Sequence, residues 1–140
     1  MEHEDYVTYD QAIKLKELGF NWECYQYYNK DKKVWSWTAE GYGDDCRDWN
    51  DNIHATLGEA ECSAPTLSQA QKWLREVKKI TILIDALSTK KQFYWKLYDN
   101  DLHFNGASNV NYNTYEETLS TGVDEALELL MIAHNHFQSH

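Results

Sequence analysis

Three stretches of the chain have apolar side chains spaced every three or four residues, the pattern of a helix with one face against a core. Each stretch opens with a threonine and has a Gln or Glu three residues later, a combination that forms a helix capping box. These pairs are Thr8 with Gln11, Thr66 with Gln69, and Thr114 with Glu117. The pattern predicts helices over about 8–18, 66–77 and 114–137.

Between the helices lie shorter runs that are rich in aromatic and β-branched residues. Runs at 25–29 and 33–38 predict a β-hairpin, a second hairpin is predicted from 80–87 and 92–99, and a short strand is expected near 102–104. Alternation along 92–99 places Phe93, Trp95 and Leu97 on one face and Tyr94, Lys96 and Tyr98 on the other. We therefore expect helices to cover the Phe93 face of a sheet that is open on its other side.

These elements predict a single α+β domain over residues 1–140, with three helices packed on a mixed or antiparallel sheet of four to five strands. The order is αββ, a loop, αββ with a short extra strand, and a closing helix. A chain of 140 residues has no room for two separate cores. The segments TYDQAIKL and TLSQAQKW share four residues at the same offsets, so 8–38 and 66–98 could be an αββ repeat, although helix capping alone selects the Thr and Gln.

The segment 40–61, EGYGDDCRDWNDNIHATLGEAE, has no helical or strand periodicity and is strongly acidic. It holds seven acids and one base, and so accounts for −6 of the formal charge of −10. A connection this long in a compact domain is usually functional or mobile. Acidic groups steer basic partners, and aromatic side chains anchor interfaces. The candidate binding residues are Tyr42, Asp44, Asp45, Asp48, Trp49 and Asp51, of which Tyr42 and Trp49 are expected to be exposed aromatics.

The net charge of −10 disfavours direct binding to nucleic acids and to anionic membranes, because both interactions depend on Lys and Arg. No apolar run reaches the roughly 18 residues of a membrane span, and the acidic start MEHEDYVTYD is unlike a signal peptide. We therefore expect a cytoplasmic protein with no membrane partner. Cys24, Cys46 and Cys62 have no close spacing, which fits reduced thiols better than disulfides or a zinc site.

No segment predicts a metal, a cofactor or a catalytic centre. Residues 48–59 place acidic and amide side chains at several positions of a calcium-binding loop, but Ile53 occupies the position that requires glycine. Cys46 or Cys62 with His54 would form a nucleophile and base only if the fold brought them together. The common hydrolase and nucleotide-binding motifs, such as GxSxG and GxGxxG, do not occur in the chain.

The exposed side of the middle helix is predicted to be basic. Its cations are Lys72, Arg75, Lys78 and Lys79, and the αβββα order of the second half is that of a double-stranded-RNA-binding domain. The closing helix argues against that function, because it has no Lys or Arg and would repel phosphates. Its acids are Glu116, Glu117, Asp124, Glu125 and Glu128.

Three pieces of the sequence, YDQAIKLKELGF, SAPTLSQAQKWLRE and TYEETLSTGVDEALELL, follow each other at distances that resemble a family of small proteins encoded by phages and prophages of Bacteroidetes. The resemblance covers most of the chain, but the matching motifs are the capped helices of the scaffold. It implies a cytoplasmic accessory protein that acts in an infected or lysogenic bacterium. It assigns no role to any residue.

The leading hypothesis is a non-enzymatic binding protein that contacts a protein partner through the acidic segment 40–61. One alternative is an acidic DNA mimic that occupies the DNA-binding groove of a host defence enzyme. This requires paired rows of acids at roughly the spacing of phosphates. The other alternative is a small enzyme or ligand sensor that uses His54, Cys62 or the loop carboxylates in a pocket. The oligomeric state is left open.

Overall fold

The computed structural model describes residues 5–36, 47–51, 60–87, 91–99 and 104–138. Contacts group the chain into two compact units, which we treat separately. The N-terminal unit is Tyr6–Thr66, and the C-terminal unit is Leu67–His140 together with Met1–Asp5. The organisation of residues 1–140 as a single domain stays a prediction.

The N-terminal unit begins with helix α1 (Tyr9–Glu17), and the predicted capping box starts it. The backbone N of Gln11 donates to Thr8 Oγ1 at 3.2 Å, and the backbone N of Thr8 donates to Gln11 Oε1 at 2.8 Å. The chain leaves the helix at Gly19, whose φ of +96° lies in the left-handed region that glycine adopts without strain. Local sequence therefore determines both ends of this helix.

A small antiparallel sheet completes the N-terminal unit. Its strands are β1 (Gln26–Tyr28), β2 (Val34–Ser36) and β3 (Cys62–Ser63), in the order β2–β1–β3. The first predicted hairpin is confirmed, with three residues in each strand. The Asn29 side chain closes its turn by accepting from the backbone N of Asp31 and of Lys33, at 2.9 and 3.1 Å.

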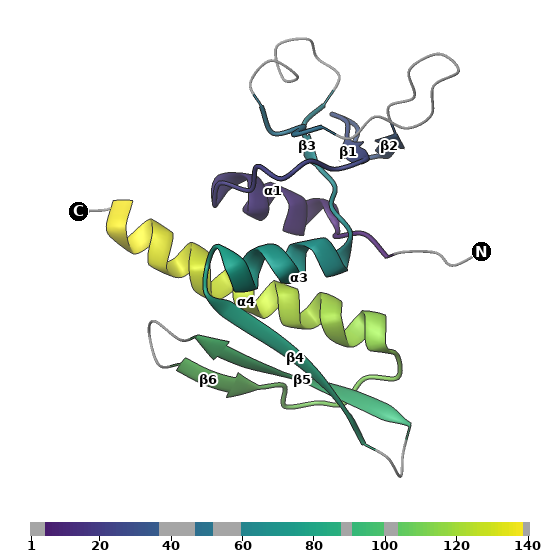
Figure 1. Ribbon diagram of the computed structural model, residues 1–140, viewed down its shortest axis with the longest axis vertical. Coiled ribbons are helices and arrows are strands. Elements are labelled where there is room, and N and C mark those ends of the chain that lie inside the picture. Colours follow the sequence, from purple (N-terminus) through teal and green to yellow (C-terminus); the bar gives the residue numbers. More distant parts are fainter. Residues whose placement is uncertain (1–4, 37–46, 52–59, 88–90, 100–103, 139–140) are drawn as a thin grey trace. The chain divides into compact units, whose positions relative to one another are not determined.

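The C-terminal unit consists of two helices and a second antiparallel sheet. Its elements are α3 (Leu67–Glu76), β4 (Ile80–Leu87), β5 (Gln92–Asp99), β6 (Phe104–Ala107) and α4 (Tyr115–Gln138). The sheet order is β4–β5–β6, and both α3 and α4 lie on one side of it (Figure 1). Ile80 pairs with Asp99 at one end of the long hairpin, and Leu87 pairs with Gln92 at the other.

The core of this unit lies between α4 and the sheet, on the face that sequence alternation predicts. Trp95, Leu97 and Ile82 are buried there. Gly122 of α4 lies so close that a Cβ atom at this position would be 3.0 Å from Ile82 Cγ2 and 3.3 Å from Trp95 Cγ. The absence of a side chain at Gly122 thus lets the helix approach the sheet. The prediction that helices cover the Phe93 side of β5 is confirmed.

The structure departs from the sequence predictions in its sheets. The α+β class and the three helices are confirmed, but the expected sheet of four to five strands is replaced by two sheets of three strands in the described residues. The hairpins that follow α1 and α3 have strands of three and eight residues and belong to different sheets, and the αββ repeat stays a prediction.

Two element ends also differ from the predictions. Helix α3 stops at Glu76, one residue before the predicted end at 77, and Val77 is 47 % exposed. Strand β6 lies at Phe104–Ala107, while 102–103 of the predicted strand are outside the described residues. Helix α4 has 24 residues, yet neither it nor any other described helix combines the length and apolar character needed to cross a membrane.

Candidate functional site

The six candidate residues of the acidic segment divide into two groups. Asp48, Trp49 and Asp51 are in the described part of the chain, whereas Tyr42, Asp44 and Asp45 lie outside it. Asp48 is half-buried, and its Oδ1 accepts a hydrogen bond from the backbone N of Asn50 at 3.0 Å. Asp51 is exposed, and its backbone N donates to the carbonyl of Asp48 at 3.3 Å. The Asp48 carboxylate therefore stabilises a turn.

Trp49 is a core residue of the N-terminal unit, and the expectation that it is an exposed contact residue is wrong. Its side chain is 1 % exposed. The indole Nε1 donates to the carbonyl of Cys24 at 2.8 Å, and the ring lies against that of Tyr27, with 4.7 Å between the ring centroids. A polar sequence around one aromatic residue does not reveal whether that residue turns inward.

Its neighbour Asn50 holds the segment 47–51 against the same core. The Asn50 Nδ2 donates to the carbonyl of Phe20 at 2.9 Å, and its Oδ1 accepts from the backbone N of Ser63 at 2.9 Å. Arg47 forms a pair of backbone hydrogen bonds with Cys24, of 2.7 and 3.0 Å. This part of the acidic segment is thus a structural support for the small sheet.

The two described cysteines, Cys24 and Cys62, are buried and form no disulfide, so they fit a structural role. Burial raises the pKa of the Cys62 thiol to about 12, which keeps it neutral at pH 7 and makes it a poor nucleophile. Cys46 and His54, the other members of the hypothetical catalytic pairs, lie outside the described residues. In the regions that the structure does describe, no group of three or more His, Cys, Asp or Glu side chains could hold a metal ion.

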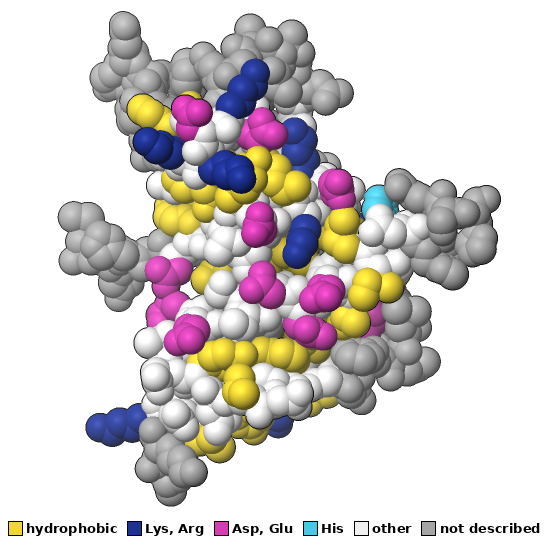
Figure 2. All heavy atoms as spheres, turned by 180° about the vertical axis from the view of Figure 1, so that it is seen from behind, with side chains coloured by type: hydrophobic (Ala, Val, Ile, Leu, Met, Phe, Trp, Pro, Cys, Tyr) yellow, Lys and Arg dark blue, Asp and Glu magenta, His cyan; other side chains and the backbone are white. Residues whose placement is uncertain are grey.

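The exposed face of α4 is a stronger candidate for a binding surface than the acidic segment. Glu117, Asp124 and Glu128 are separated by seven and four residues, so they lie along one face of the helix, and all three are exposed. Figure 2 shows acidic side chains gathered over α4. The helix contains no Lys or Arg, and Ile132, four residues beyond Glu128, is 61 % exposed. We call Glu117, Asp124 and Glu128 the acidic row.

A second exposed surface is the side of the β4–β5–β6 sheet that faces away from α3 and α4. We call it the open face; its side chains come from Leu83, Asp85, Tyr94, Lys96, Tyr98 and Ala107. Tyr94 Oη donates to Asp85 Oδ2 at 3.0 Å, and Lys96 Nζ lies 3.6 Å from the same oxygen. Lys96 Nζ also lies 5.5 Å from the centroid of the Tyr94 ring. The centre of this face is therefore an ordered polar group.

The hydrogen bonds of this group stabilise the charged form of Asp85. The Tyr94 hydroxyl holds the pKa of the Asp85 carboxyl below its usual range, with a smaller contribution from the backbone N of Ala86, which donates to Oδ1 at 2.9 Å. The pKa of Lys96 is raised, chiefly by its interaction with Tyr94. Both groups are charged at neutral pH, so the open face holds one anion and one cation side by side.

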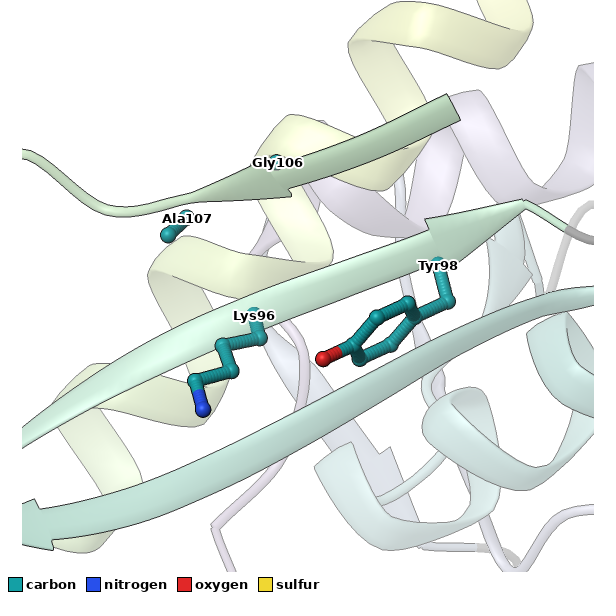
Figure 3. A pocket seen from close by; sticks show the side chains of 4 residues that line it. All are labelled: Lys96, Tyr98, Gly106 and Ala107. Carbon is teal, nitrogen blue, oxygen red and sulfur yellow. The ribbon is translucent and has the colours of Figure 1, made fainter. Parts of the chain in front are cut away.

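Beside this group the open face is slightly hollowed. A recess of about 300 Å³ is lined by Lys96, Tyr98, Gly106 and Ala107. Lys96 and Tyr98 point from β5 to the same side of the sheet, while helices pass behind it (Figure 3). The recess is shallow because Gly106 and Ala107 contribute little side chain. Among the described residues that line it, Lys96 is the one charged group and there is neither a carboxylate nor a histidine, so these residues offer no acid–base pair.

The predicted basic side is present on helix α3, where Lys72 and Arg75 are exposed, and Lys79 is exposed in the connection that follows the helix. The C-terminal unit also has the α3–β4–β5–β6–α4 order that the sequence suggested.

No family model, no curated protein and no solved structure matches the chain. Its resemblance to phage and prophage proteins therefore stays a prediction.

Proposed function

We propose that the protein is a non-enzymatic binding protein that contacts a basic protein partner through the exposed acidic face of α4. The observation that supports this proposal is the acidic row, Glu117, Asp124 and Glu128, on a helix that carries no Lys or Arg. Such a surface raises the association rate of a positively charged partner and repels acidic competitors. Following the resemblance to phage and prophage proteins, we further propose an accessory role in the cytoplasm of an infected or lysogenic bacterium.

Ile132 gives the acidic row an apolar end. It continues the row after Glu128 by one helical turn and is 61 % exposed. Charged rim contacts add little affinity by themselves, whereas an apolar side chain that becomes buried in the complex contributes more per residue. We therefore expect the acids to set the orientation of the partner and Ile132 to be the buried anchor.

The acidic row favours protein contact over DNA mimicry. A mimic of duplex DNA must offer charges along two backbones, whereas the acidic row follows a single line along one helix. The recess on the open face likewise gives no support to the enzyme hypothesis, because Lys96 and Tyr98 are the only titratable groups among its described lining residues. Protein contact is therefore the function that the described surface supports best.

Affinity capture with three variants tests this proposal. The first variant neutralises the row by Glu117→Gln, Asp124→Asn and Glu128→Gln. The second removes four of the seven acids of the acidic segment, by changing Asp44, Asp45, Asp48 and Asp51 to Asn. The control removes the same charge as the first variant from exposed acids elsewhere, by Glu17→Gln, Asp31→Asn and Glu76→Gln.

We expect the wild type and the control to retain a basic protein from a phage-infected lysate and the row variant to lose it. If only the acidic-segment variant lost the protein, binding would belong to residues 40–61 as the sequence first suggested. If all variants retained it, neither acidic surface would be the site.

A further inference from the structure

The open face lies on the opposite side of the molecule's C-terminal sheet from the helices, and the acidic row makes no use of it. Leu83 on this face is 46 % exposed, which is high for a leucine in the middle of a strand. In the described part of this unit, both helices pack against the other face. An exposed leucine beside two tyrosines and an ion pair is a composition found in protein interfaces.

The edges of the sheet are protected, which directs a partner to the face. On the β4 edge, Gln71 Nε2 of α3 donates to the carbonyl of Ile82 at 2.8 Å, and the Asp85 carboxylate accepts from the backbone N of Ala86 at 2.9 Å. Backbone groups that would receive an added strand are thus occupied at two positions. Side-chain protection of this kind discourages edge-to-edge pairing.

The other edge is interrupted by extra residues. Trp95 pairs with Ser108 through the Ser108 backbone N, at 3.0 Å, and Phe93 pairs with Tyr112 through two hydrogen bonds of 2.8 Å. A regular antiparallel ladder would pair Phe93 with the residue two positions beyond Ser108, so two additional residues are accommodated between the pairs. Val110 in this interruption is 56 % exposed. Such a bulge hinders the addition of a strand to this edge.

We propose that the open face is a homodimer interface, in which the open face of a second copy of the chain packs against it. The charges on the face support a second copy over a basic or an acidic partner. Asp85 and Lys96 give the face no net charge, although the chain as a whole has a formal charge of −10. A surface that carries both members of an ion pair can meet its own copy with opposite charges facing each other.

The strand register gives this arrangement a definite geometry. Leu83 lies opposite Lys96, and Asp85 lies opposite Tyr94, so the four residues form a rectangle with sides of about 5 and 7 Å. A two-fold axis along the Leu83–Tyr94 diagonal stacks Leu83 on its copy and places Asp85 of each molecule near Lys96 of the other. The strands then cross at roughly 70°, close to the orthogonal class of sheet packing.

The contact area sets the strength of the dimer. Two strands of eight residues and one of four cover at most roughly 14 by 27 Å, which is smaller than a standard stable interface. We therefore expect a weak dimer whose population grows with concentration over the micromolar range. This dimer is independent of the proposed binding through α4, because it uses different residues.

Sedimentation velocity over a concentration series tests the proposal with the intact chain. The wild type should move from monomer toward dimer as its concentration rises. Leu83→Asp should remain monomeric, with a dissociation constant raised at least tenfold, whereas Val77→Asp, at an apolar position of similar exposure outside the face, should behave like the wild type. A wild type that is monomeric at every concentration, or a Leu83→Asp variant that dimerises normally, would overturn the proposal.

A charge-swap experiment distinguishes this packing from a general effect on folding. Asp85→Lys leaves two cations on each face, and Lys96→Glu leaves two anions, so each variant alone should be monomeric. An equimolar mixture of the two should form a heterodimer, and the double variant Asp85→Lys/Lys96→Glu should dimerise again. Circular dichroism shows whether each variant is folded. Folded variants that fail to associate in the mixture would contradict the proposed pairing of Asp85 with Lys96.

Discussion

At the residue scale, Trp49 shows how a polar segment can hide a core side chain. It lies between Asp48 and Asn50, in a run whose composition predicts solvent exposure. The Asn50 side chain, however, bonds to Phe20 and Ser63, and these contacts place the indole inside the N-terminal unit. Such contacts join residues far apart in sequence, so hydrophobic periodicity cannot reveal them.

Replacement of Trp49 by Ala should lower the free energy of unfolding by about 3 to 5 kcal/mol, because it removes a large buried ring and the hydrogen bond from the indole to the Cys24 carbonyl. Urea denaturation measures this change. Trp35→Ala, at a tryptophan that is 54 % exposed, is the matched control and should cost less than about 1 kcal/mol. Equal effects at the two positions would mean that Trp49 is not a core residue.

The Cys62 thiol should make the protein less stable in alkali. The unfolded thiol ionises near its ordinary pKa, about 8.5, whereas burial raises the pKa of the folded thiol to about 12. The contribution of the neutral Cys62 thiol to the free energy of unfolding is thus fully present below the pKa of the unfolded thiol. It is lost as the pH rises from about 9 toward 12, because the unfolded state then releases the proton first.

Denaturation of the wild type and of Cys62→Ala at pH 8 and pH 10 checks this sign. The fall in the free energy of unfolding between the two pH values should be about 2 kcal/mol smaller in the variant. The constant cost of removing the side chain cancels in this comparison. An identical fall in both proteins would show that the thiol has no such role.

At the element scale, sequence predicted what neighbouring residues determine. The cap at Thr8, the hairpin turn at Asn29 and the alternation along β5 all involve residues within one element or one turn, and the structure confirms them. The division of the strands into two sheets depends on pairings such as Tyr28 with Cys62, across 33 intervening residues. Nothing in the strand periodicity specifies such a partner. The expected single sheet of four to five strands is therefore not confirmed, because strand periodicity does not identify pairing partners that lie far apart in the sequence.

The packing of α4 on its sheet depends on Gly122. Gly122→Val should destabilise the protein by about 1 to 3 kcal/mol, because the new side chain must push Ile82 or Trp95 out of place. Thr121→Val, at the neighbouring position outside the contact, should change stability by less than about 0.5 kcal/mol. Thermal denaturation of both variants gives the comparison. A Gly122→Val variant as stable as the wild type would mean that the helix does not approach the sheet so closely.

At the scale of the whole molecule, the charge is unevenly distributed. The acidic row of α4 and the neutral open face belong to the same unit, and each suits a different partner: a basic protein for the first and a second copy of the chain for the second. The sequence contains these acids at the spacing of the row, but without a fold they argue only against RNA binding. Their exposure on one helix face makes α4 a better candidate than the acidic segment.

The affinity of the captured partner for the wild type and for the row variant tests the central claim most directly. Three exposed charge contacts of about 0.5 to 1 kcal/mol each predict that Glu117→Gln/Asp124→Asn/Glu128→Gln weakens binding by at least about tenfold at low salt. The difference should shrink as salt rises, because screening weakens the same contacts in the wild type. An unchanged dissociation constant for the row variant, with the control variant also unchanged, would contradict binding through α4.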